Sequence, residues 1–216
     1  NSKVVTENEI DYTLYYYVVN EGTPVPAKGY PTEVDSVFAT YQGVSLFNLD
    51  NPTVFETQNS ATWFTLDAVV RGWSHGFVHF KGGENVTNNG PITYLNGGQG
   101  VIFMPSGLGY RNSGTGSIPA NTPLYFYINL FDIVEGTDHD NDGLASYLEL
   151  EDITVESDPR KVDTDANGFP NYFDADDDGD GKLTKDEDAN GDGDPRNDFS
   201  DPANPTLPDY LNPDIK

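Results

Sequence analysis

Residues 69–80 read Val-Val-Arg-Gly-Trp-Ser-His-Gly-Phe-Val-His-Phe, a helical pattern inside a region that is otherwise typical of strands. The apolar residues of this stretch recur with the spacing of one helix face. They are Val69, Val70, Trp73, Phe77 and Phe80. Gly72 and Gly76 have low helix propensity, so the helix is expected to be short.

Runs rich in aromatic and β-branched residues lie on both sides of this helix and predict strands. The expected strands cover residues 11–20, 34–41, 62–66, 101–104 and 123–134. Turn-forming residues predict loops, and the polar N-terminus is expected to be loosely held. These segments are residues 1–10, 21–32, 42–53 and, as an inserted hairpin or loop, 82–100. Several strands with one short helix indicate an antiparallel α+β domain ending near Val134.

The chain has 216 residues and a net charge of -25, and its acidic residues gather toward the C-terminus. Residues 1–131 hold 10 acidic and 5 basic residues, a net -5, whereas residues 132–216 hold 26 and 6, a net -20. This change predicts two regions. Residues 1–135 have an ordinary globular composition, and residues 136–216 would be disordered unless their charge is neutralised.

The composition also excludes several classes of partner and site. Such acidity argues against nucleic acid and against adsorption to anionic lipid. No apolar run is long enough to cross a membrane. The chain has no cysteine, which excludes disulfides, a thiol nucleophile and zinc–thiolate sites. Because the chain starts at Asn1 without Met, we expect that a leader was removed.

Five fragments resemble, in the correct order, the sequence marks of FKBP-type peptidyl-prolyl isomerases. The helical stretch at residues 69–76 is similar to the helix signature of that family. The other four fragments are Tyr41-Gln42-Gly43, Val54-Phe55-Glu56, residues 103–110 (Phe-Met-Pro-Ser-Gly-Leu-Gly-Tyr) and residues 118–126 (Ile-Pro-Ala-Asn-Thr-Pro-Leu-Tyr-Phe). The resemblance implies a twisted antiparallel sheet wrapped around a short helix.

The same resemblance implies a proline-binding pocket with Trp73 as its floor. The implied walls are Tyr41, Phe55, Val69, Val70, Ile118 and Phe126. The Tyr110 hydroxyl would donate a hydrogen bond to a substrate carbonyl, and Glu56 stands where the family usually has Asp. Such a pocket would isomerise X-Pro bonds of protein substrates without a nucleophile, by binding the twisted amide more tightly than the planar one.

Several residues depart from the family pattern. Glu56 is one methylene longer than the usual Asp, Thr62 stands where a pocket aromatic is usual, and Arg111 follows Tyr110 where Gly is usual. Trp63 is expected to point to the other face of its strand. These departures predict an enzyme weaker than a typical member of the family.

Asp-rich loops in residues 136–216 have the spacing of calcium ligands. In residues 138–149, carboxylates stand at loop positions 1, 3, 5 and 12, Gly143 occupies the sharp turn at position 6, and Leu144 offers its carbonyl at position 7. Three further loops follow, of which the last is degenerate. The predicted ligands of structural Ca²⁺ are Asp138, Asp140, Asp142, Leu144, Glu149, Asp163, Asp165, Asn167, Asp174, Asp176, Asp178, Asp180, Lys182, Glu187, Asp188, Asn190 and Asp192.

The first loop is the most similar to an EF-hand, whereas residues 163–198 resemble tandem thrombospondin type-3 calcium repeats. Calcium loops of modest affinity fit an extracytoplasmic space, whether periplasm, cell surface or medium. The leading hypothesis is therefore an extracytoplasmic prolyl isomerase with a calcium-bound stalk. The rival is a non-catalytic FKBP-like binding module of a cell-surface or secreted protein, with a calcium-binding spacer. The sequence leaves a cell-surface or lipid-anchored context open. A calcium sensor is disfavoured, because Met104 is the single methionine and sensors expose Met-rich grooves.

Overall fold

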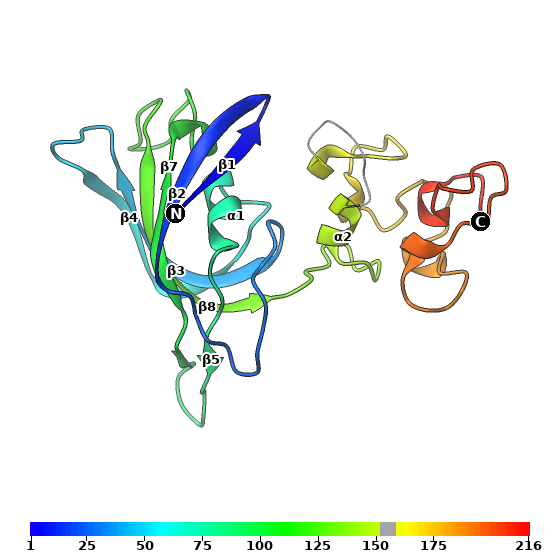
Figure 1. The fold of residues 1–216 in the computed structure, drawn as a ribbon, viewed down its shortest axis with the longest axis horizontal. Helices are drawn as coiled ribbons and strands as arrows, with labels where there is room; N and C mark the ends of the chain where they lie inside the picture. The colour runs from blue at the N-terminus through cyan, green and yellow to red at the C-terminus, as the bar shows by residue number, and fades with distance from the viewer. Residues whose placement is uncertain (152–158) are drawn as a thin grey trace. The chain divides into compact units, whose positions relative to one another are not determined.

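The structure is a computed structural model that describes residues 1–151 and 159–216. It contains two compact units, residues 1–135 and residues 136–216 (Figure 1). The first unit is built on a β-sheet, and the described part of the second consists of loops and short helices.

Six strands form the sheet of the first unit, in the order β1-β2-β7-β8-β3-β4, and every neighbouring pair is antiparallel (Figure 1). The strands are β1 (Ser2–Glu7), β2 (Ile10–Asn20), β3 (Ser36–Ser45), β4 (Thr53–Thr65), β7 (Gly98–Met104) and β8 (Leu124–Val134). Aromatic and β-branched residues favour these strands because their side chains fit a pleated, half-buried surface. The predicted α+β sheet around a short helix is confirmed.

The helix α1 (Arg71–Phe77) packs against β2 and β7. It begins after Val70, whose backbone is extended. The two helix glycines permit a close approach to the sheet, because a Cβ on Gly72 would overlap Met104 and a Cβ on Gly76 would overlap Ile102. The glycines therefore bring the helix against the sheet, in addition to limiting its length.

The hydrophobic core of the first unit lies between α1 and the sheet. Each large apolar side chain buried there stabilises the fold by roughly 1.5–3 kcal/mol. The fully buried members are Leu14, Val37, Ala39, Leu66, Phe77, Phe80, Ile102, Leu108, Leu124 and Leu130.

Two sequence-based expectations for this unit are wrong. Residues 1–10 are not loosely held, because β1 pairs with β2 and buries Val5 and Glu7. Glu7 is buried and forms an ion pair with Arg71. Its polar side chain interrupts the alternating apolar pattern from which a strand is predicted. Residues 42–53 are not simply a turn-rich connection, because β3 runs to Ser45 and β4 begins at Thr53.

The inserted segment of residues 82–100 contains the expected hairpin. Its strands are β5 (Glu84–Asn85) and β6 (Tyr94–Leu95), which pair with each other in a separate two-stranded sheet. The last residues of the segment belong to β7, which begins at Gly98 and is longer than the predicted strand.

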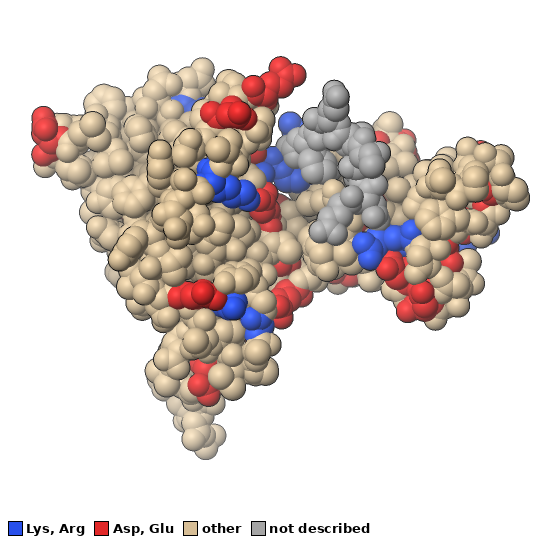
Figure 2. Space-filling model, in the orientation of Figure 1, with Lys and Arg blue, Asp and Glu red and all other residues tan. Residues whose placement is uncertain are grey.

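The second unit has short helices between its loops. They are α2 (Ser146–Glu151), η2 (Pro159–Lys161), η3 (Asn171–Phe173), η4 (Thr184–Asp186), η5 (Pro195–Asn197) and η6 (Asp209–Leu211). Much of the face of this unit drawn in Figure 2 is uncharged despite the acidic sequence, which agrees with the burial of Asp142, Glu149 and Asp177. Within the described part of the chain, no helix has the length and apolarity needed to span a bilayer.

Candidate functional site

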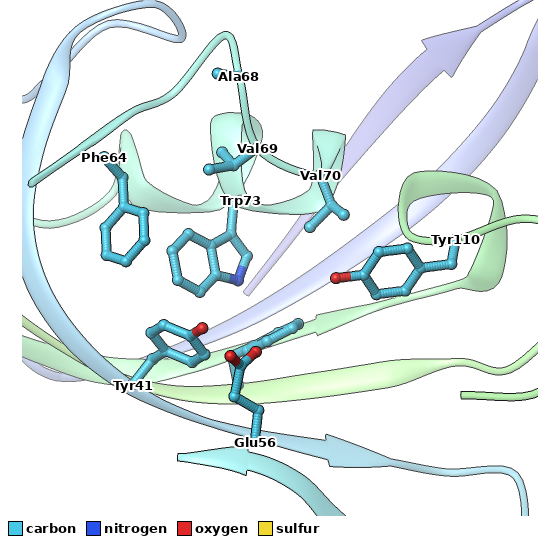
Figure 3. A pocket seen from close by; sticks show the side chains of 9 residues that line it. Tyr41, Glu56, Phe64, Ala68, Val69, Val70, Trp73 and Tyr110 are labelled. Atoms are coloured by element: carbon cyan, nitrogen blue, oxygen red, sulfur yellow. The ribbon is translucent and has the colours of Figure 1, made fainter. Parts of the chain in front are cut away.

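Most of the residues predicted for the pocket converge on one cavity of about 270 Å³ in the first unit (Figure 3). The cavity is lined by Tyr41, Glu56, Phe64, Ala68, Val69, Val70, Trp73, Tyr110 and Phe126. These side chains come from β3, β4, β8, α1 and the segments before α1 and after η1 (Ser106–Leu108). Packing α1 against the sheet therefore assembles the cavity from residues far apart in the sequence.

The Trp73 indole lies among the other side chains that line this cavity (Figure 3). The rings of Tyr41, Phe64 and Phe126 meet it edge-on, with centroids 4.8, 5.3 and 5.3 Å away. This edge-to-face geometry holds the indole in one orientation. Trp73 is 4% exposed, and its Nε1 has no hydrogen-bond partner. Because an unpaired buried N–H is costly, the floor of the cavity offers a donor to a ligand.

Three polar groups surround the indole. Figure 3 shows the Tyr110 hydroxyl and the Glu56 carboxylate pointing into the cavity from different sides. Burial, followed by the hydrogen bond and the charge of Glu56, raises the pKa of Tyr41 above its ordinary range. Burial and then the charge of Glu56 also raise the pKa of Tyr110. Both tyrosines are therefore protonated at neutral pH and can donate hydrogen bonds.

Two predicted wall residues lie outside the cavity lining. Phe55 packs edge-on against Phe126 at a centroid distance of 5.7 Å. Ile118 is 5% exposed and belongs to the core cluster. Phe55 therefore supports the cavity wall at Phe126, and Ile118 is a core residue.

The sequence analysis missed Phe64 and Ala68. Phe64 lies two residues after Thr62, on the same face of β4, and supplies an aromatic ring to the cavity. Trp63 lies on the other face, against Phe38 at 5.1 Å. Strand alternation, which placed Trp63 outside the pocket, would also have placed Phe64 inside it.

Arg111 carries a backbone cost that the usual glycine would avoid. Its φ is +53°, in the left-handed region that favours glycine. The Arg111 N–H donates to the Ser106 carbonyl at 2.8 Å, which holds the turn beside Tyr110. A non-glycine residue in this region costs on the order of 1 kcal/mol.

The pocket residues fall within a region that matches a known family. A family model described as FKBP-type peptidyl-prolyl cis-trans isomerase matches residues 28–131. Residues 28–131 are therefore similar to an FKBP-type domain, and we refer to this matched region by that name. This domain holds every residue that lines the cavity, while β1 and β2 precede it in the chain.

Curated relatives and solved structures are similar to part of this chain. The chain is 28% identical over 121 residues to FKBP-type peptidyl-prolyl cis-trans isomerase FkpA of Escherichia coli K12, across 56% of this chain and 37% of the relative. The chain thus spans about a third of the length of the curated relatives that it matches. The FkpA of Escherichia coli O157:H7 matches to the same extent.

Among solved structures, the crystal structure of Escherichia coli FkpA is 24% identical, with 62% of this chain and 53% of that chain covered and a TM-score of 0.44. A peptidyl-prolyl cis-trans isomerase from Pseudomonas syringae pv. tomato DC3000 is 22% identical, with coverages of 56% and 76% and a TM-score of 0.43. The N-terminal domain of FKBP42 from Arabidopsis thaliana is 14% identical, with coverages of 62% and 94% and a TM-score of 0.44.

Beyond the FKBP-type domain, the four Asp-rich loops share one backbone conformation. The glycine at position 6 of each loop has a left-handed φ, +95°, +100°, +92° and +89° for Gly143, Gly168, Gly181 and Gly193. The N–H of each glycine donates to the carboxylate at position 1, which belongs to Asp138, Asp163, Asp176 and Asp188. The fourth loop therefore keeps the turn, although Phe199 replaces an acid at its position 12.

Carboxylates converge in the first and third loops. The three acids at positions 1, 3 and 5 lie with oxygens within 4.8 Å of one another, in Asp138, Asp140 and Asp142 and again in Asp176, Asp178 and Asp180. The second loop differs, because the Asn167 amide donates to both Asp165 and Asp174, at 3.0 and 2.6 Å. Among the residues that the structure describes, the predicted ligands of the second and fourth loops form no such cluster of acids.

The acids at position 12 of the first and third loops are among the most deeply buried predicted ligands. Glu149 and Glu187 are each 1% exposed, and none of their carboxylate oxygens has a hydrogen-bond partner. Burial, followed by the charges of Asp177 and Asp142, raises the pKa of Glu149 to about 10. Burial, followed by neighbouring acids, raises the pKa of Glu187 to about 8. Buried oxygen ligands without partners fit a hard cation such as calcium.

Proposed function

We propose that the FKBP-type domain is a peptidyl-prolyl cis-trans isomerase that acts on proline-containing proteins outside the cytoplasm. The observation that carries this proposal is the aromatic cavity lined by Trp73, with two protonated tyrosines in its lining. The relatives that match this region carry the name of the same activity.

The proposed chemistry asks the pocket only to favour a twisted amide. Rotation about a peptide bond meets a barrier of roughly 18–20 kcal/mol, because resonance keeps the amide planar. A proline ring packed against Trp73 would leave its preceding carbonyl near the Tyr110 hydroxyl. Hydrogen bonding and water exclusion that are stronger for the twisted form than for the planar form lower the barrier.

The test is an X-Pro isomerisation assay without a coupling protease, run over peptides that differ in the residue before proline. Tyr110→Phe removes one neutral hydrogen bond of about 0.5–1.5 kcal/mol, so the rate should fall only several-fold. Tyr127→Phe is the matched control, because Tyr127 is 48% exposed and lies outside the cavity lining. If the wild-type chain accelerates none of the peptides, the proposal fails.

The second candidate is a non-catalytic binding module. The observations that favour it are the longer acid at Glu56 and the left-handed backbone of Arg111 beside Tyr110. A binding module would hold proline peptides in the same cavity without accelerating their isomerisation. Peptide binding measured beside the rate assay separates the two functions.

We also infer that residues 136–216 form a stalk stabilised by structural calcium. The buried acids without partners at Glu149 and Glu187 support this inference. Calcium would supply a charge partner for them and would add its binding free energy to folding. An extracytoplasmic location belongs to the same proposal, because loops of modest affinity fill where calcium is abundant. Calcium titration of the full chain, with a chelator as the reference state, tests it.

A further inference from the structure

A third cluster of acids joins two of the loops in the second unit. One carboxylate oxygen each of Asp142, Glu149 and Asp177 lies within 4.8 Å of the other two. Asp142 and Glu149 hold positions 5 and 12 of the first loop, whereas Asp177 holds position 2 of the third. The spacing of single loops assigns no ligand to position 2. The cluster therefore contains an acid that the loop pattern leaves out.

These acids are buried and incompletely paired. Asp142, Glu149 and Asp177 are 0%, 1% and 1% exposed. Both oxygens of Glu149 and the Oδ1 of Asp177 have no hydrogen-bond partner. Three carboxylates at this distance repel one another, and their unpaired oxygens lose hydration without gaining a donor. A cation between them would remove both costs.

The local structure aims Asp177 at the first loop. Thr184 donates its hydroxyl to Asp177 Oδ2 at 3.0 Å, whereas Asp177 Oδ1 has no hydrogen-bond partner. The neighbouring acids Asp176 and Asp178 converge with Asp180 in their own loop. Asp177 lies between them in the sequence and does not belong to that cluster, so its carboxylate is available to the first loop.

The residue at position 2 of the first loop also contacts a neighbouring loop. The His139 ring packs edge-on against Tyr172 and Phe173 of η3, with centroids 5.7 and 4.8 Å away. The residue at position 2 therefore contacts another loop in two cases. His139 of the first loop packs against η3, and the Asp177 carboxylate of the third loop approaches the first loop.

We propose that a calcium ion binds between the first and third loops, held by Asp142, Glu149 and Asp177, which we call the interloop site. This proposal rests on the proposed calcium-bound stalk and adds a site that ties residues 138–149 to residues 176–187. Because ligands from two loops meet at one ion, binding at the first loop requires the third loop to be folded. The stalk then folds as one calcium-dependent unit rather than loop by loop.

The test compares calcium binding by three forms of the full chain, using native mass spectrometry for the number of ions and calorimetry for affinity. Asp177→Asn should lose one ion, or bind one ion at least about tenfold more weakly, because it removes a charged ligand. Asp186→Asn is the matched control, since Asp186 is an exposed acid of the same loop outside the three clusters. It should bind like the wild-type chain.

A purely structural role for Asp177 is tested by Thr184→Val. This variant removes the hydrogen bond to Asp177 and keeps the carboxylate, so the full number of ions should bind at saturating calcium. If Thr184→Val loses the same ion as Asp177→Asn, or if Asp177→Asn binds like Asp186→Asn, the interloop site is wrong.

A measurement on the wild-type chain does not depend on how the variants fold. Crystals grown with terbium in place of calcium should show an anomalous peak between Asp142, Glu149 and Asp177. Terbium bound at the separate loops, with no ion within ligand distance of Asp177, overturns the interloop site alone. If residues 136–216 bind no calcium at all, the interloop site and the proposed stalk fail together.

Discussion

Removal of calcium is expected to unfold residues 136–216 and to leave residues 1–135 folded. Each ion that binds only the folded chain adds about 2.7 kcal/mol when calcium is 100 times its Kd. Ions in the first three loops would together add about 8 kcal/mol, which is comparable to the whole stability of a typical domain, about 5–15 kcal/mol. Without them, the unpaired carboxylates of Glu149 and Glu187 remain buried beside other acids. Chelation should therefore remove most of the free energy that keeps this unit folded.

Hydrogen exchange with peptide-level resolution measures this effect on the two units at once. In excess chelator, amides between Asp138 and Asp198 should lose their protection, whereas those of β7 and β8 should keep theirs. Magnesium is the control cation, because its smaller octahedral shell fits a flexible loop poorly and should restore little protection. Equal exchange of residues 138–198 with calcium and with chelator would refute the reasoning. Lost protection in the sheet would show that the two units do not unfold independently.

Three further predictions concern the FKBP-type domain and its N-terminal strand. Trp63→Phe leaves Trp73 as the remaining tryptophan of the two in the chain, so its fluorescence should change when a proline peptide binds; an unchanged spectrum at saturating peptide would place the site elsewhere. Glu56→Asp should raise the isomerisation rate about two- to tenfold, about 0.4–1.4 kcal/mol, by withdrawing the carboxylate from the cavity; a lower rate would show that the longer acid fits this pocket. Burial opposes ionisation of Glu33, but hydrogen bonds and charges of His75 and Lys3 outweigh it and lower its pKa to about 2. Because this pKa is depressed, its stabilisation is present above the unfolded pKa near 4.3 and is lost as pH falls toward 2. Because the Glu33 side chain is 33% exposed, solvent screening reduces this loss of unfolding free energy to about 1–2 kcal/mol. Glu33→Gln should abolish the loss when thermal unfolding is measured at acidic pH.

The fold was predictable where the sequence carries periodic apolar residues. The short helix and the strands around Leu14 and Ile128 follow from such patterns, and the ordered family marks specify how these elements are connected. The first strand was not predictable, because its buried Glu7 is polar and is compensated by Arg71, 64 residues later in the chain. The alternation of apolar and polar residues predicts a strand from its buried apolar side chains. A side chain that is buried in an ion pair does not contribute to this pattern.

The sequence predicted those residues of the candidate pocket that belong to a family-like fragment and also line the cavity. Trp73, Tyr110 and Phe126 lie in the marks and line the cavity. Phe64 lies outside the marks, and only strand alternation from Trp63 indicates it. The ligand spacing does not predict Asp177 as a ligand, because that spacing describes positions within one loop. Asp177 belongs to the third loop and is proposed to bind an ion shared with the first. Contacts between repeats depend on how the loops pack, which a ligand pattern within one loop does not encode.

The composition of residues 136–216 explains why metal ions are the available means of holding this unit together. Among its described residues, the buried large hydrophobic side chains are Leu144, Tyr172 and Tyr210, too few to stabilise a unit of this size through a core. Small units with weak cores need covalent or metal cross-links. The chain has no cysteine, so disulfides cannot supply them. Its abundant carboxylates can bind calcium instead, and an ion held by two loops acts as a cross-link, because it constrains segments far apart in the sequence. Under the proposed calcium binding, the acidity that would otherwise unfold this unit is the feature that would let calcium fold it.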